Sequence, residues 1–282
     1  MTRRPRLQVV ASPHVHAPDS TTRIMWTVVL SLVPVIGAAA FYFGISALLV
    51  IAAATAGALL TEKLFGSKDV PAGGPGVRDG SAAITGLLLG LTLPAGLPLW
   101  MAFTGGFFAI GFGKLIFGGL GQNVFNPALL GRAFLQAAFP VALTTWPLPR
   151  TAGDAAAGFW TLRGDNFALP LLGDDLDAVT GATPLGLMKF EGETTATFDL
   201  FMGGVGGSLG ETSALLILLG GLYLAWKNYL NWRIPVSVLL VVGALSSVLY
   251  ALDPGRLPGA PFMLLSGGLM LGAWYMATDM VT

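Results

Sequence analysis

The amino-acid sequence predicts an all-α protein that crosses a membrane several times. Of its 282 residues, 54% are hydrophobic and only 11% carry a charge, whereas a soluble domain usually has about 25% charged residues. Long stretches contain no Asp, Glu, Lys or Arg, and one of them covers residues 24–61. This composition excludes a disordered chain, an ordinary soluble globule and a protein that binds nucleic acid through a basic face.

The first half of the chain contains five candidate membrane helices. A helix needs about 20 apolar residues to span the hydrocarbon, so the run 24–61 predicts two helices with Gly44 between them. Segment 81–93 is too short for a full crossing, because Pro94 follows it, and short segments of this kind are typical of membrane sites. The predicted helices, in order, lie at about 24–43, 45–62, 81–93, 98–116 and 127–145.

The second half begins with a polar segment. Residues 146–207 contain eight acidic residues, only three basic ones and no long apolar run, which predicts one excursion outside the membrane. Three more helices are expected, at about 209–226, 234–251 and 261–278. The expected organisation is therefore an N-terminal segment (1–23), a first membrane half (24–145), the external segment (146–207) and a second membrane half (208–282), with about eight helices of which one is short or broken.

The basic residues predict an orientation. With the N-terminus in the cytoplasm and segment 81–93 counted as a crossing, ten Lys and Arg residues fall inside and four outside. Such a bias is the usual mark of the cytoplasmic side. We therefore expect an inner (plasma) membrane protein of a bacterium, with the N-terminus cytoplasmic, segment 146–207 periplasmic, and membrane lipids around the helices.

The external segment carries the most informative motif. Residues 177–185 read DAVTGATPL, which resembles the Asp-x-x-(Ser/Thr)-Gly-Ala-(Ser/Thr) sequence recognised by flavin transferases. The resemblance implies a covalent FMN, joined by a phosphoester to Thr183, with Asp177, Thr180, Gly181 and Ala182 as the recognition loop. A hydroxyl is the group that accepts the phosphoryl, and the redox chemistry would belong to the flavin. The alternative interpretation is an ordinary turn.

Further strings resemble a known family. Residues 79–94 (DGSAAITGLLLGLTLP), 117–128 (FGGLGQNVFNPA), 207–213 (GSLGETS) and 276–279 (MATD) are similar to the D subunit of the Rnf electron-transport complex and to its relative, the B subunit of the sodium-translocating NADH:quinone reductase. The short N-terminal segment and the Thr-Pro-Leu version of the flavin motif favour Rnf. The family has ten helices in two inverted halves of five, so this chain is expected to be either incomplete or divergent.

The resemblance implies a function. It predicts a subunit of a complex that exchanges electrons between ferredoxin and NAD, coupled to Na⁺ or H⁺ movement, with FMN on Thr183 as one relay. The expected partners are the other subunits and a flavin transferase, and a second, non-covalent flavin is one further expectation. No NAD or ferredoxin motif is evident in the sequence, so no catalytic residue is assigned. The alternatives are the quinone reductase, a non-redox channel or transporter, and a scaffold for redox partners.

A few polar residues inside or beside the predicted helices are candidates for function, because ionisable groups are costly in a membrane. Arg132 would neutralise a flavin phosphate or a nearby acid, or else cap a loop. Glu211 and Asp279 would join a cation path, or else sit at a helix terminus. Lys114 is expected to be a boundary anchor. With no cysteine and only two histidines, His14 and His16, no metal site is predicted.

Overall fold

The described part of the structure, a computed structural model, is helical throughout. It covers residues 20–66, 77–150, 158–170 and 181–279, in which twelve α-helices occur and no strand is present. Three helices are long and apolar enough to cross a membrane: α1 (Thr21–Phe43), α2 (Ile45–Phe65) and α10 (Arg233–Leu252). The prediction of an all-α membrane protein is thereby confirmed, while Asp177 and Thr180 of the motif, and His14 and His16, lie outside the described residues.

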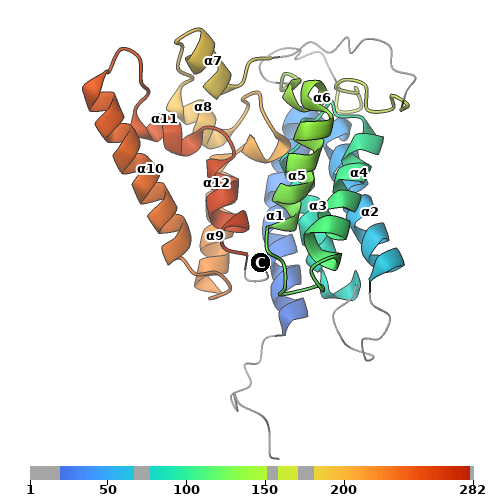
Figure 1. The fold of residues 1–282 in the computed structure, drawn as a ribbon. Coiled ribbons are helices and arrows are strands. Elements are labelled where there is room, and N and C mark those ends of the chain that lie inside the picture. Colours follow the sequence, from blue (N-terminus) through green and yellow to red (C-terminus); the bar gives the residue numbers. More distant parts are fainter. Residues whose placement is uncertain (1–19, 67–76, 151–157, 171–180, 280–282) are drawn as a thin grey trace, which may run out of the picture.

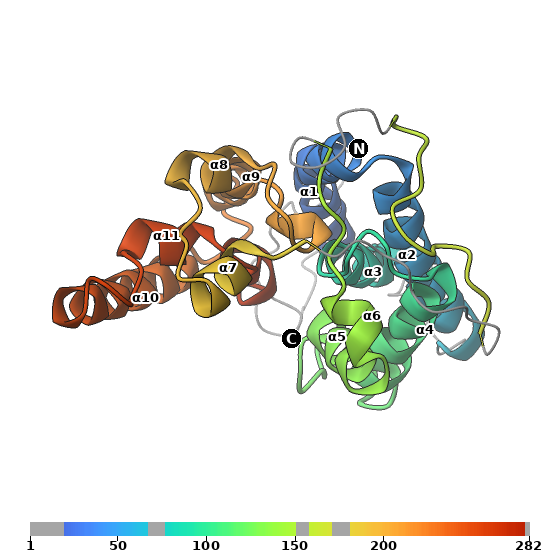
Figure 2. The same cartoon turned by 90° about the horizontal axis from the view of Figure 1, so that it is seen from above.

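The first half forms a compact bundle. It contains α1 and α2, the short α3 (Ser81–Leu91), α4 (Leu99–Ile110) with a wider π turn (Gly111–Leu115), α5 (Pro127–Ala138) and α6 (Pro140–Thr144). Figure 2 shows these helices grouped together, with α2 and α4 side by side. Small residues allow the close approach, as at Gly90, where an added methyl group would lie 2.8 Å from Ile51 Cα.

The second half is more open. It contains α7 (Pro184–Phe190), α8 (Thr197–Met202), α9 (Ala214–Trp226), α10, α11 (Ala260–Leu265) and α12 (Leu269–Leu271) with a π turn (Gly272–Met276). In Figure 1, α7 and α8 lie at the end of the molecule where α1 finishes, and α10 lies at the outer edge. Hydrogen bonds join the halves, as from Tyr275 Oη to Ser31 Oγ at 3.2 Å.

Several predicted helices are interrupted, which corrects the expectation of only one short or broken helix. The predicted helix 127–145 breaks at Phe139, because Pro140 has no N–H to continue the ladder. The predicted helix 209–226 starts only at Ala214, after a 3₁₀ turn (Leu209–Glu211). The predicted helix 261–278 breaks between α11 and α12, where Gly267 adopts a positive φ of 65°. Apolar composition alone predicted a continuous helix in each of these three segments, whereas the backbone leaves the helical conformation within each of them.

The segment 146–207 is tied closely to the helix ends. Arg163 N donates to Ser46 Oγ at 2.8 Å, and Leu99 N donates to the carbonyl of Asn166 at 2.9 Å. Asn166 is only 1% exposed, and its amide group donates to the carbonyls of Ala95 and Leu97 at 2.9 and 3.1 Å. The segment therefore covers one end of the first bundle and holds the link between α3 and α4 in place.

Candidate functional site

Thr183 begins a short helix at one end of the molecule. It is the N-cap of α7, and its Oγ1 accepts a hydrogen bond from Gly186 N at 3.1 Å. Pro184 follows at the first helical position, where a missing N–H costs nothing. The side chain is half-buried, and Ala182 beside it is exposed. The hydroxyl that the sequence singles out thus lies on a defined, accessible corner of the chain.

The residue before Ala182 is fixed by the neighbouring loop. Gly181 N donates to the carbonyl of Trp146 at 2.7 Å. A methyl group at Gly181 would collide with the side chain of Leu148, whose Cγ would lie 2.9 Å away. A residue larger than glycine would therefore have to displace the Leu148 side chain, which gives a physical reason for glycine at this position of the motif.

A pocket opens beside Thr183. Its volume is about 540 Å³, within the range of about 300–1,000 Å³ typical of small-molecule sites. Its walls combine apolar side chains, one acid and the glycine-rich loop 203–206, and include Ala182, Pro184, Tyr42, Leu148, Leu187, Thr195 and Asp199. Because Ala182 and Pro184 flank Thr183 in the chain and line this space, a planar group tethered to the hydroxyl has room next to it.

Helix α7 rests on the broken helix of the second half. A methyl group at Gly267 would lie 2.9 Å from Leu185 Cδ1. The following residue, Gly268, lies against Glu211, since a methyl group there would be 3.7 Å from Glu211 Oε1. Helix α7, which follows Thr183, therefore contacts the break between α11 and α12. The same break lies against the half-buried carboxylate of Glu211.

Glu211 and Arg132 form a charged junction between the two halves. Arg132 Nη1 donates to the carbonyl of Thr92, at the end of α3, and the guanidinium interacts electrostatically with the carboxylate of Glu211. Glu211 also accepts hydrogen bonds from Ser208. Arg132 thus bonds the end of α3, as its capping alternative predicts, and its charge acts on a neighbouring acid, as one of its expected functional roles predicts. Glu211 is not in the first turn of α9, whose cap is Ser213.

A second buried charged cluster lies at the opposite end of the first bundle. Lys114 Nζ contacts Glu62 Oε1 at 2.5 Å and Ser81 Oγ at 2.6 Å, and Ser81 Oγ donates to Asp79 Oδ1 at 2.7 Å. Lys114 is only 3% exposed, so its expected role as a boundary anchor is wrong. Sequence reasoning missed Glu62 and Asp79, although both are acids next to otherwise uncharged runs.

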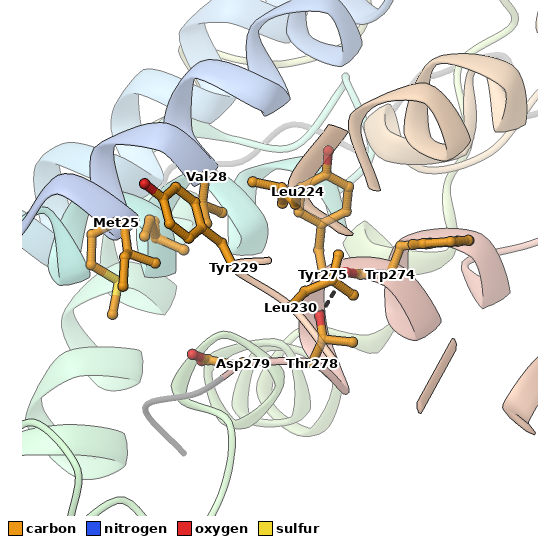
Figure 3. A pocket seen from close by; sticks show the side chains of 11 residues that line it. Met25, Val28, Leu224, Tyr229, Leu230, Trp274, Tyr275, Thr278 and Asp279 are labelled. Carbon is orange, nitrogen blue, oxygen red and sulfur yellow. Dashed lines mark hydrogen bonds between the residues drawn. The ribbon is translucent and has the colours of Figure 1, made fainter. Parts of the chain in front are cut away.

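Asp279 lines a small pocket beside the N-terminal turns of α1 (Figure 3). The pocket has a volume of about 40 Å³ and is lined by Met25, Tyr229 and Trp274, among others. It has room for little more than a few water molecules. Three aromatic residues of the segment 146–207, Trp160, Phe190 and Phe198, are 78%, 80% and 67% exposed.

Short and broken helices that meet at half-buried charges define a class of membrane protein. Here the end of α3, the break between α11 and α12, and the pair Arg132 and Glu211 come together. Interrupted helices at charged junctions are typical of membrane proteins that move ions or small solutes. The chain belongs to the family described as NQR2, RnfD, RnfE, whose model matches residues 8–282. The family resemblance of its motifs is thereby confirmed.

Named relatives agree with this membership. The chain is 41% identical over 288 residues to the D subunit of the proton-translocating ferredoxin:NAD(+) oxidoreductase complex of Clostridium ljungdahlii, covering 97% of this chain and 78% of that one. It is 40% identical over 281 residues to the Na(+)-translocating counterpart of Acetobacterium woodii, covering 97% and 77%. The D subunit of an ion-translocating oxidoreductase complex of Stutzerimonas stutzeri is 47% identical over 216 residues, 72% of this chain and 60% of that one.

Proposed function

We propose that the protein is the D-type membrane subunit of an ion-translocating ferredoxin:NAD oxidoreductase complex of the Rnf type, and that it carries covalent FMN on Thr183 as an electron relay. Membership of the family and similarity to named D subunits support the complex. The finding that carries the flavin proposal is the position of Thr183 between Ala182 and Pro184, two residues that line a pocket of about 540 Å³, and close to a glycine that packs against Leu148. The ferredoxin and NAD sites then belong to partner subunits.

The residues around Thr183 fit a tethered flavin. The hydroxyl would hold the phosphoester, and the pocket beside Ala182 and Pro184 would receive the rest of the group. FMN supplies one- and two-electron redox chemistry that no side chain here provides. The glycine-rich loop 203–206 adds little side-chain bulk to its part of the pocket wall, while Tyr42 and Leu148 give the pocket apolar walls.

A contact path joins this site to the charged junction. Leu185 on α7 lies against Gly267, and Gly268 lies against Glu211, which interacts with Arg132. A movement of α7 that accompanies reduction would therefore press on the break beside Glu211. The energies are compatible: a two-electron drop of about 100 mV releases roughly 4.6 kcal/mol, and moving one charge against about 150 mV costs roughly 3.5 kcal/mol.

The proposed orientation follows the basic residues. The N-terminal segment 1–23 is placed in the cytoplasm and the Thr183 segment in the periplasm of a bacterial cell, with membrane halves at 24–145 and 208–282. Labelling of a cysteine introduced at Glu193, which is exposed, tests this directly. A membrane-impermeant maleimide added to intact spheroplasts should react with it, whereas reaction only after lysis would reverse the orientation.

The flavin proposal is tested by expressing the full chain with its complex and its flavin transferase. The denatured chain should show flavin fluorescence on a gel and the mass of one FMN adduct. Thr183→Ala should abolish both, Thr183→Ser should retain them, and Thr195→Ala, which changes a hydroxyl that lines the neighbouring pocket, should leave them unchanged. A colourless wild-type chain would contradict the proposal and favour a non-redox transporter.

The same preparation separates the remaining alternatives. A quinone reductase would support NADH-driven quinone reduction instead of ferredoxin-dependent NAD reduction. If the chain is only a scaffold, the wild type would still show the fluorescent band, but Thr183→Ala would not reduce electron flow through the complex. Flavin released on denaturation of this chain after its separation from the other subunits would identify the second, non-covalent flavin that the family resemblance suggests.

A further inference from the structure

The turn between α9 and α10 carries two tryptophans, each followed by a basic residue. Residues 226–233 read WKNYLNWR. Trp226 is 80% exposed and Trp232 is 55% exposed. Lys227 and Arg233 beside them are exposed as well. Exposed tryptophans on a membrane protein are typical of the boundary between the hydrocarbon and the lipid headgroups, so this composition places the turn at the level of the headgroups.

Each basic group lies over the ring of the tryptophan that precedes it. Lys227 Nζ is 5.8 Å from the centroid of the Trp226 ring, and Arg233 Cζ is 5.6 Å from the centroid of the Trp232 ring. Both distances are within the limit of about 6 Å for a cation–π contact. A ring face attracts the cation but accepts no conventional hydrogen bond from it, so the N–H groups of both side chains stay available to a ligand.

No acidic residue balances these two charges. Between Glu211 and Asp253 the sequence contains no Asp or Glu, and Lys227 and Arg233 are its only Lys and Arg residues. Neither side chain forms a salt bridge or a hydrogen bond within the part of the chain that the structure describes. The turn therefore presents two positive charges beside two apolar rings, which complements a negatively charged headgroup joined to acyl chains.

The backbone of the turn is held from inside the fold. Leu230 is 4% exposed, and together with Tyr229 it lines the small pocket beside the N-terminal turns of α1 (Figure 3). Asn228 adopts a φ of 61° and ends α9, where Tyr229 N donates back to the last turn of that helix. Asn231 Oδ1 accepts a hydrogen bond from Arg233 N at 3.2 Å. The exposed pairs thus project from a turn whose shape is fixed.

Two other exposed basic residues at this end of the molecule differ from this pattern. Lys63 lies in the last turn of α2, and Arg78 lies in the 3₁₀ turn (Val77–Asp79) before α3. Figure 1 shows the end of α2 and the α9–α10 turn at the same, lower side of the molecule. Lys63 and Arg78 each stand next to an acid in the chain, and neither lies over an aromatic ring among the described residues. They share the charge and the location of the turn but not its tryptophans.

We infer that the α9–α10 turn binds the headgroup of an anionic phospholipid. Lys227 and Arg233 donate to the phosphate, and the rings of Trp226 and Trp232 contact the glycerol and the first carbons of the acyl chains. A free phosphate ion has the same charge but offers the two rings no apolar surface, so the lipid matches both features of the turn. The site depends neither on the proposed flavin nor on electron transfer.

Native mass spectrometry of the intact complex, taken from micelles doped with phosphatidylglycerol, counts the lipid bound. The double variant Lys227→Gln and Arg233→Gln should carry one phosphatidylglycerol fewer per copy of this chain, because the phosphate loses both donors. The double variant Trp226→Leu and Trp232→Leu keeps both charges and should bind that lipid at least tenfold more weakly. An unchanged count and affinity in these two variants would overturn the inference.

The matched control is the double variant Lys63→Gln and Arg78→Gln, which removes two charges at the same end of the molecule. It should keep the wild-type count, and a loss equal to that of the Lys227 and Arg233 variant would show that net charge alone attracts the lipid. Excess inorganic phosphate should displace no phosphatidylglycerol. Displacement would assign the turn to a free anion, and release of a partner subunit with the lipid count unchanged would assign it to a protein contact. Each of these three results contradicts the inference.

If the variants do not assemble, the wild-type complex decides. A phosphatidylglycerol with a photoreactive group in its headgroup should label residues 226–233, whereas a phosphatidylcholine with the same group should label them much less. Absence of label from this turn, or equal labelling by the two lipids, would overturn the inference.

Discussion

Leu185 of α7 lies directly against Gly267, the glycine at the break between α11 and α12. Gly267 has a φ of 65°, and a methyl group there would be 2.9 Å from Leu185 Cδ1. Leu185 is two residues after Thr183, the proposed flavin attachment site. It therefore contacts the break between α11 and α12. This contact places the external segment and the second membrane half in direct mechanical connection.

Gly267→Ala should weaken this connection. A side chain at positive φ is strained, at a cost of about 1–3 kcal/mol, and the added methyl group must displace Leu185. We expect a lower thermal midpoint of the complex and reduced ion transport, with flavin attachment at Thr183 retained. Gly272→Ala is the matched control, because nothing lies within 4 Å of its added methyl group. Equal effects of the two substitutions would show that the contact with Leu185 is unimportant.

Gly181→Ala should impair flavin attachment through Leu148. The new methyl group would overlap the Leu148 side chain, so the loop before Thr183 must shift away from Trp146, whose carbonyl holds Gly181 N. We expect a weaker fluorescent band per mole of chain on a denaturing gel.

The cause of that loss can be separated from motif recognition. Leu148→Ala in the same chain removes the overlapping atoms and should restore the band if the effect is steric. Gly158→Ala, whose methyl group would have only a 3.8 Å contact, should have no effect. A double variant that stays colourless would instead show that the flavin transferase itself requires glycine.

Long, uniform helices were predictable from the sequence, whereas their interruptions were not. The expected helices 24–43 and 45–62 correspond to α1 and α2 within three residues at each end. The break at Gly267 escaped prediction although Ser266, Gly267 and Gly268 mark it in the sequence, because glycine is also frequent inside membrane helices, where it allows close packing. The break at Phe139 had a visible signal in Pro140, but Pro at a helix start and Pro within a helix look alike in sequence.

The candidate site was predictable in part for a similar reason. Thr183 stands in a continuous motif, which sequence reading detects. The pair of Lys114 and Glu62 is separated by 52 residues, and no local pattern brings them together. Arg132 was suspected from its place within a predicted helix and Glu211 from its place at the start of one, but their interaction depends on how the two halves pack.

Arg132→Leu should destabilise the junction between the halves. It removes the donor to Thr92 and leaves Glu211 without its counter-charge. Because both groups are half-buried, we expect a loss of about 1–3 kcal/mol, below the 3–5 kcal/mol of a fully buried pair. Thermal unfolding of the complex measures this loss.

A second substitution distinguishes charge from packing at this junction. Adding Glu211→Gln to Arg132→Leu removes the unpaired acid and should recover part of the lost stability. Arg78→Leu serves as the control, since Arg78 is exposed in the 3₁₀ turn before α3. Additive losses in the double variant would contradict an interaction between Arg132 and Glu211.

Asn166→Leu should loosen the external segment from the end of the first bundle. The substitution preserves size but removes the amide that donates to the carbonyls of Ala95 and Leu97. A buried acceptor left without a partner costs about 1–3 kcal/mol, so thermal stability should fall, and hydrogen exchange should rise in the link between α3 and α4. Gln136→Leu, an exposed amide on α5, should change neither. Because Leu99 N also bonds to the backbone carbonyl of Asn166, unchanged exchange at Leu99 would mean that this backbone contact alone holds the segment in place.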